Sequence, residues 1–201
     1  MKKIMMMMCV ALCAMAFTNL HQDHFQVDTK KSSIHWIGEK VTGTHEGTIS
    51  ILSGVISLEH GKLVAARLTI NMKSITNTDI ESEEYSQKLV NHLKAEAFFD
   101  VANHPTAELK MIKASPTEVG FEVLGSLTIK GETQPATFLV AIQQRENTLI
   151  ASGTMSFDRT KYGITHGSGS FIDDLGDRAI YDEVKLDFSI MAENRIHGEH
   201  N

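Results

Sequence analysis

Apolar and polar residues alternate along most of this chain. Residues 64–73 show the pattern clearly, with apolar side chains at every second position: Val64, Ala66, Leu68, Ile70 and Met72. The same period of two recurs in four further segments: 107–111, 121–129, 149–157 and 184–190. Such alternation predicts antiparallel strands that keep one face in an apolar interior and the other face in water.

Turn-forming residues separate these segments, at 59–62, 131–132 and 145–147. Two more strands are expected at 33–41 and 47–58, which brings the named segments to seven, and we expect about eight strands in all. Consecutive strands joined by short turns favour an antiparallel meander, and this number of strands is typical of a closed barrel. The sequence therefore predicts an all-β fold: an antiparallel eight-stranded barrel forming one compact domain.

One helix is expected to interrupt the strands. Thr78 and Glu81 have the spacing of a capping box. The residues that follow place large side chains on one helical face at four-residue intervals: Tyr85, Leu89 and Leu93. The pattern predicts one short helix that lies across an opening of the barrel.

Two adjacent aromatic residues, Phe98 and Phe99, stand between this helix and Pro105. Neighbouring residues of an extended segment point to opposite faces, so the two rings cannot share one burial site. The pair favours a segment that folds over the barrel end and closes its interior, with Phe99 structural and Phe98 nearer to a ligand. A small hydrophobic cluster beneath a loop is the alternative.

The expected inner face of the barrel mixes large residues with small ones: Ala66, Ala107, Gly125, Ala151 and Gly153. An eight-stranded barrel can be filled by side chains or can hold one small ligand. The small residues favour space along the axis, although they could instead only relieve packing in a twisted wall. If the alternation sets the register, the tunnel is lined by eight residues: Leu68, Ile70, Leu109, Met111, Phe121, Val123, Met155 and Phe157. Strands of about ten residues run ~30 Å, which suits an extended hydrocarbon chain.

The N-terminal segment has the order of a signal peptide: two lysines, an apolar run over 4–15, and a small-x-small cleavage site before Phe17. We therefore expect a signal peptide at 1–16, a barrel domain at 17–192 and a polar tail at 193–201, in a periplasmic or secreted protein. The apolar run is short for a bilayer, so no integral membrane span is expected.

Both cysteines, Cys9 and Cys13, lie within this leader, so the mature chain is expected to hold no disulfide. Anchoring as a lipoprotein through one of these cysteines is the rival interpretation. Lipoprotein processing requires a small residue before the cysteine, whereas Met8 and Leu12 stand there. The sequence favours cleavage without lipidation.

Charge excludes one class of partner. Without the two leader lysines, the mature chain carries 17 basic and 25 acidic residues, a net charge of −8. Nucleic acid is therefore not expected as a partner, and anionic lipid surfaces would repel the domain. If the protein handles lipid, we expect it to enclose an apolar tail.

Four segments, in order along the chain, carry a resemblance to a known family: WIGEKVTGTHEGTI (36–49), HLKAEAFFDVANHP (92–105), GSLTIKGETQPATF (125–138), and FDRTKYGI with GDRAIYDEVKL (157–164 and 176–186). Over residues 26–192 the chain resembles the YceI-like family of lipid- and polyisoprenoid-binding proteins. The resemblance implies a lipocalin-like barrel that encloses a long-chain isoprenoid or a related lipid. Trp36, which opens the first segment, joins the expected ligand-binding residues.

Two polar residues are candidates to hold a lipid head group. His45 matches an early histidine of the family and could donate to a head group near the mouth, or it could cap a turn. Arg159 belongs to an Asp-Arg pair that the family segment usually carries. Its alternative role is a structural salt bridge with Asp158 at the strand end.

No catalytic constellation stands out in the sequence. It lacks a His-x-x-x-His metal motif, a Gly-x-Ser-x-Gly elbow and, once mature, any cysteine. The Gly-Ser-Gly-Ser run at 167–170 lacks the lysine and the strand-to-helix setting of a phosphate-binding loop. His197 and His200 lie in the polar tail, where only adventitious metal binding is expected. We therefore expect no enzyme, no metal site and no cofactor apart from a bound lipid.

Two functions stay open at this stage. The first is non-enzymatic binding of a polyisoprenoid, an isoprenoid quinone or a fatty-acid-like lipid, as a periplasmic carrier, buffer or sensor. The second is a solidly packed barrel that serves as a protein-interaction or adhesion module without a ligand. A homodimer is compatible with either function.

Overall fold

The computed structural model describes residues 22–194. The expected signal peptide with Cys9 and Cys13, its cleavage site before Phe17, and most of the expected tail, including His197 and His200, lie outside the described residues. Those expectations stay predictions.

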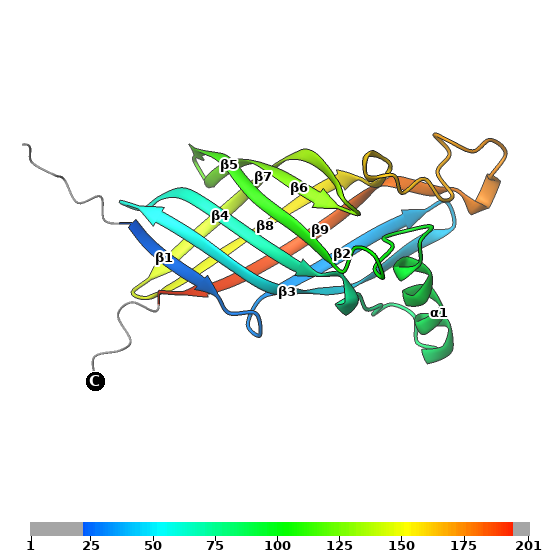
Figure 1. Ribbon diagram of the computed structural model, residues 1–201, viewed down its shortest axis with the longest axis horizontal. Helices are drawn as coiled ribbons and strands as arrows, with labels where there is room; N and C mark the ends of the chain where they lie inside the picture. Colours follow the sequence, from blue (N-terminus) through cyan, green and yellow to red (C-terminus); the bar gives the residue numbers. More distant parts are fainter. Residues whose placement is uncertain (1–21, 195–201) are drawn as a thin grey trace, which may run out of the picture.

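Strands make up most of the described chain (Figure 1). The elements are β1 (Gln22–Val27), β2 (Ser33–Lys40), β3 (Gly43–Glu59), β4 (Lys62–Asn71), the 3-10 helix η1 (Met72–Ser74), α1 (Glu83–Lys94), β5 (Thr106–Thr117), β6 (Gly120–Ile129), β7 (Glu132–Arg145), β8 (Thr148–Asp158), the 3-10 helices η2 (Arg159–Tyr162) and η3 (Gly176–Arg178), and β9 (Ile180–Glu193).

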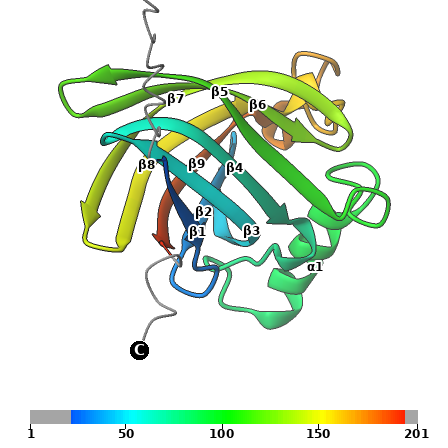
Figure 2. The same cartoon turned by 60° about the vertical axis from the view of Figure 1, so that its left-hand side comes forward.

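The strands close into a barrel. Each of β2 to β8 pairs antiparallel with the next strand in sequence, and β9 pairs with β2 to complete the ring. Figure 2 shows these strands curling around one interior. The all-β, eight-stranded antiparallel barrel predicted from the alternation is therefore confirmed.

The ninth strand, β1, lengthens the barrel wall. It pairs with the second half of β3 and with the last residues of β9, whereas β2 pairs with the first half of β3. The strands β1 and β2 thus lie end to end beside β3 and occupy one strand position in the wall, interrupted by a turn at 28–32. The backbone N–H of Asp28 donates to the Met191 carbonyl at 2.8 Å and ties this turn to β9.

A β-bulge corrects the predicted register at the start of β4. Ser57 pairs with Ala65, but its neighbour Leu58 pairs with Leu63, so Val64 is the extra residue. Leu63 points inward and is buried, whereas Val64 is exposed. The prediction that Val64 faces the interior was wrong because a bulge shifts the alternation by one residue.

The helix begins later than its sequence signals indicated. Ser82 is the N-cap of α1, and no side chain caps it, so the predicted Thr78–Glu81 capping box was wrong. Thr78 instead donates its backbone N–H to the Glu46 carbonyl on β3 at 3.0 Å. Val90 is the buried helix residue and Tyr85 is 62% exposed, because four-residue steps drift by about 40° around a helix.

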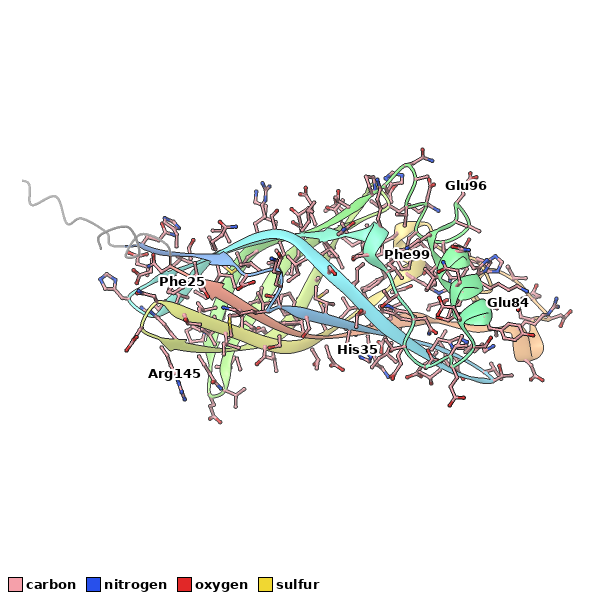
Figure 3. All side chains as sticks on the ribbon, turned by 90° about the horizontal axis from the view of Figure 1, so that it is seen from below. Phe25, His35, Glu84, Glu96, Phe99 and Arg145 are labelled. Atoms are coloured by element: carbon pink, nitrogen blue, oxygen red, sulfur yellow. The ribbon has the colours of Figure 1, made fainter. Side chains whose placement is uncertain are left out.

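The two ends of the barrel differ in construction. The connections at 41–42, 72–105, 130–131 and 159–179 meet at the end that carries α1, which we call the helix end. Short turns close the other end, which we call the far end. Figure 3 shows Phe25 toward the far end and Phe99 at the helix end.

Packed side chains close the far end. Phe25, Leu58 and Leu149 are at most 1% exposed and belong to one continuous core. Phe25 comes from β1, so the extra strand supplies the largest side chain of this plug. Open space in the barrel is therefore confined to the middle and the helix end.

Candidate functional site

An apolar cavity, the inner chamber, occupies the middle of the barrel. Its volume is about 100 Å³, and every side chain that lines it is apolar. Ala66 and Ala151 contribute to its wall, and Phe138 and Phe188 meet edge to face with ring centroids 5.9 Å apart. A wall without hydrogen-bonding side chains favours hydrocarbon over water or a polar metabolite.

A second cavity, the helix-side chamber, adjoins the first. Its volume is about 150 Å³, and four residues line both chambers: Ile34, Ile70, Leu127 and Leu186. Four aromatic rings from three separate parts of the chain surround it: Trp36, Phe98, Phe99 and Phe157. The two chambers therefore follow one another along the barrel axis, from the plugged far end to the helix end.

The structure brings most of the predicted ligand-binding residues to these chambers. The inner chamber is lined by five of them: Leu68, Leu109, Met111, Val123 and Met155. Ile70 lines both chambers, and Trp36, Phe98, Phe99, Phe157 and Arg159 line the helix-side chamber. Phe121 and His45 line neither. That any of these residues contacts a ligand stays a prediction.

Part of the wall of the inner chamber was not predicted from the sequence. Phe138, Val140 and Ile142 on β7 line the inner chamber, together with Leu186, Phe188 and Ile190 on β9. These β7 residues stand at every second position, but Leu139 and Ala141 between them are apolar too, so the alternation is weaker here than in the predicted strands. Phe121 lies nearer the far end, opposite Val140, and packs on the core instead of lining a chamber.

Small residues serve two different purposes in this wall. A Cβ on Gly153 would lie 2.3 Å from the Leu139 carbonyl oxygen and 2.9 Å from the Phe188 ring, so this glycine permits close packing. Gly125 is similar, with the Lys110 carbonyl 3.1 Å from its hypothetical Cβ. The prediction that these glycines leave axial space was wrong, whereas Ala66 and Ala151 do border the inner chamber.

The aromatic pair lies in a turn and not in an extended segment, which corrects the expectation of opposite faces. Phe98 donates its backbone N–H to Ala95 and Phe99 donates to Leu93, and this turn lets both rings border the helix-side chamber. Phe98 is 5% exposed, whereas Phe99 is half-buried. Burial thus favours a structural role for Phe98, the reverse of the predicted division.

Two histidines pack against Phe98. The His92 ring on α1 lies 4.8 Å from the Phe98 ring centroid and 5.0 Å from that of His166. Phe98 and His166 are 5.2 Å apart, so three rings from three segments form one cluster. Burial, followed by the proximity of His166, lowers the pKa of His92 below its ordinary value.

The strap at 75–79 joins α1 to the barrel and runs along β3. Trp36 donates its indole N–H to the Thr76 carbonyl at 3.0 Å. A Cβ on Gly47 would lie 2.0 Å from that same oxygen, so only glycine admits the strap here. This contact fixes the Trp36 ring in the chamber wall.

His45 holds the strap instead of facing a chamber. Its Nδ1 lies 2.8 Å from Asp79 Oδ2, and the Glu46 backbone N–H donates to Asp79 Oδ1. Burial acts to raise the pKa of Asp79, but hydrogen bonds from Glu46, His45 and Asn77 outweigh it and hold this pKa below its usual value. The geometry gives no support to a head-group role for His45.

Arg159 clamps the long loop at 163–179 to β9. Its guanidinium donates to four carbonyl oxygens, those of Ile164, His166, Ile180 and Tyr181, and to the Asp182 carboxylate. These bonds occupy the five N–H groups that an arginine has, so none is left for a head group. Burial lowers the pKa of Arg159, and Asp182 and Asp158 oppose that effect.

The prediction that Arg159 forms a salt bridge with Asp158 was wrong. Asp158 caps η2 by accepting from the backbone N–H and the hydroxyl of Thr160, at 2.9 and 2.6 Å. The ion pair of Arg159 is with Asp182, at 3.3 Å. The local sequence could not show this because Asp182 is 23 residues away.

Comparison with known families agrees with this barrel and its cavity. The model of the YceI-like domain matches residues 25–192, most of the chain. The chain belongs to the YceI-like family. The match spans the eight strands of the closed barrel except for the last residue of β9, the two chambers, and the second half of β1.

Solved structures share this YceI-like fold. Burkholderia cenocepacia BcnA superposes with a TM-score of 0.66 at 23% identity, covering 83% of this chain and 99% of that protein. A polyisoprenoid binding domain from Saccharophagus degradans, implicated in plant cell wall breakdown, gives 0.60 at 14% identity, covering 85% and 98%. The Campylobacter jejuni YCEI protein gives 0.54 at 15% identity, covering 96% and 98%. No curated protein matches the chain.

Within residues 22–194, His, Cys, Asp and Glu side chains nowhere gather in the groups of three or more that could hold a metal ion. Across this same range, no helix has the length and apolarity needed to cross a membrane.

Proposed function

We propose that this YceI-like protein binds one long-chain apolar lipid inside its barrel and does so without catalysis. The candidates are a polyisoprenoid, an isoprenoid quinone and a fatty-acid-like lipid. The observation that carries the proposal is the pair of adjoining chambers, whose lining side chains are apolar apart from three. These are Arg159, whose N–H groups are all hydrogen-bonded, Trp36, whose indole N–H binds Thr76, and Tyr181. A polar metabolite would lose its hydration there without gaining partners.

The fold also suggests the direction of binding. Phe25, Leu58 and Leu149 fill the far end, so an apolar tail enters from the helix end and points toward this plug. Burying ~600 Å² of hydrocarbon at ~25 cal/mol/Å² yields ~15 kcal/mol before the costs of association. Those costs remove a large share of it, which leaves micromolar to nanomolar affinity within reach.

The cellular role that we propose is that of a carrier, buffer or sensor of lipid in the periplasm. The leader-like order of residues 1–16 supports export. The Saccharophagus degradans domain supports the ligand class through its description as a polyisoprenoid binding domain, and at 14% identity it does so only through the shared fold.

Organic extraction of purified protein, followed by mass spectrometry, tests the proposal. We expect a long-chain lipid in near-equal molar amount, or uptake of an added prenol by delipidated protein. Extracts without lipid, together with no uptake of prenols or fatty acids, would contradict the proposal. That result would favour the interaction module with a ligand-free barrel.

A further inference from the structure

Exposed aromatic side chains collect at the helix end. Tyr85, Phe171 and Tyr181 are the large aromatic residues that are exposed in the described range 22–194, and all three lie at this end. Ile172 lies beside Phe171 and is 44% exposed. Exposed apolar groups that gather in one place mark an interaction site more often than single exposed residues do.

The loop that carries Phe171 and Ile172 is held firmly by hydrogen bonds. Ile180 donates its backbone N–H to Gly167 at 2.8 Å, and the Ser170 hydroxyl donates to Asp182 at 2.7 Å. The backbone N–H groups of Phe171 and Ile172 both donate to the carbonyl of Ser168, a fully buried residue. This hydrogen-bonded turn therefore holds the side chains of Phe171 and Ile172 at the surface.

This apolar surface adjoins the cavity. Tyr181 lines the helix-side chamber and is also 52% exposed, so it belongs to both the wall and the outer rim. Its neighbour in sequence, Asp182, is the residue that binds Ser170 next to Phe171. The pairing of β2 with β9 is irregular here, since Gly38 pairs with Val184 but Lys40 pairs with Ile180.

The negative charge around this surface disfavours an anionic partner. Asp173, Asp174 and Asp177 follow Ile172 in the loop, against one cation, Arg178. An anionic surface would be repelled, whereas a zwitterionic surface would not. Tyrosine and phenylalanine are suited to the boundary between head groups and hydrocarbon, where a ring can enter while nearby carboxylates stay in water.

We propose that the docking rim, formed by Phe171, Ile172 and Tyr181, binds a zwitterionic lipid bilayer, so that the ligand passes between the bilayer and the helix-side chamber. This step rests on the proposed lipid-binding function. It explains why the exposed aromatic residues stand at the one end of the barrel that is not plugged by core side chains.

Vesicle flotation and lipid transfer test the proposal. Wild type is compared with the double variant Phe171→Ser, Ile172→Ser, and with Val119→Ser, which alters a 73% exposed apolar residue in the far-end turn. With phosphatidylcholine vesicles that contain a fluorescent prenol, the double variant should show at least about tenfold weaker binding and slower transfer. Val119→Ser should match wild type, and added phosphatidylglycerol should weaken wild-type binding.

The outcomes separate this proposal from the function on which it rests. Uptake of prenol diluted from solvent, without vesicles, should be the same in the double variant and in wild type. Solvent uptake by wild type without any flotation would overturn bilayer docking and leave a protein as the partner of this rim. Equal flotation and transfer by wild type and the double variant would overturn it too. Failure of wild type to take up prenol by either route would overturn the proposed function itself.

Discussion

The same strands form two structurally different ends of the barrel, one plugged and one that holds a cavity. At the far end, short turns join the strands and Phe25, Leu58 and Leu149 fill the interior. At the helix end, long connections cross the barrel and a chamber remains among aromatic rings. Side-chain volume closes the far end, whereas polar clamps hold the helix end around a cavity. Stability and ligand binding should therefore respond differently to substitutions at the two ends.

The largest effect is expected from Arg159→Met. The substitution removes five hydrogen bonds: four carbonyl oxygens lose their guanidinium donor, and the Asp182 carboxylate loses its cation while keeping the Ser170 hydroxyl. We expect a loss of about 4 kcal/mol in the free energy of unfolding, measured in urea. Arg145→Met, at an exposed far-end position, is the matched control and should change this energy by less than about 0.5 kcal/mol. Equal losses in the two variants would show that the Arg159 hydrogen bonds do not stabilise the loop at 163–179.

The aromatic pair should separate stability from release. Phe98→Ala removes a buried ring from the cluster with His92 and His166, and should lower stability by about 3 kcal/mol. Phe99→Ala removes a half-buried ring that borders the same chamber, and should lower stability less while speeding release of bound prenol. Thermal melting and stopped-flow release measure the two effects. If neither variant releases prenol faster, this segment is not a gate.

Filling the inner chamber should block prenol binding with only a modest loss of stability. Ala151→Trp places a large ring in a cavity of about 100 Å³, with an overpacking penalty of about 1–3 kcal/mol. Thr154→Trp adds the same ring at an exposed position of the same strand and is the control. We expect prenol uptake to disappear in the first variant and to persist in the second. Undiminished uptake by a folded Ala151→Trp protein would place the ligand outside the barrel.

The smallest effect concerns pH and should be confined to the helix end. Because the pKa of His92 is lower in the folded state, the unfolded chain takes up the proton more readily. The stabilisation from neutral His92 is complete above the ordinary histidine pKa of about 6.5, and it decreases as the pH falls below that value. Amide exchange in α1 should quicken from pH 7 to pH 5, relative to the far-end strands. In His92→Gln this relative change should shrink, and an unaltered change would exclude His92 as its source.

The difference between the ends also explains what the sequence could reveal. Alternation is a local property, so the strands, the closed barrel and residues such as Leu68 and Val123 were accessible from it. The bulge at Val64 was not, because its register depends on how Leu58 pairs across the strands. The strand at 132–145 shows the pattern only in part, because Leu139 and Ala141 are apolar residues among the inward-facing Ala136, Phe138, Val140 and Ile142.

The helix end resisted prediction because its contacts join distant residues. Arg159 finds Asp182 and two carbonyls beyond residue 179, and the adjacent Asp158 is occupied by Thr160. His45 finds Asp79, 34 residues away, and the Phe98–Phe99 turn depends on carbonyls at the end of α1. Sequence patterns singled out these residues but could not assign their partners.

The central claim is that a hydrocarbon chain fills the two chambers in succession. Calorimetric titration of delipidated protein with linear prenols of increasing length tests it most directly. The account predicts one ligand per chain and an affinity that rises with length, by up to about 0.8 kcal/mol per buried CH₂, until the tail reaches the plug at Phe25 and the gain stops. Binding that is absent, or an affinity that does not depend on chain length, would contradict it.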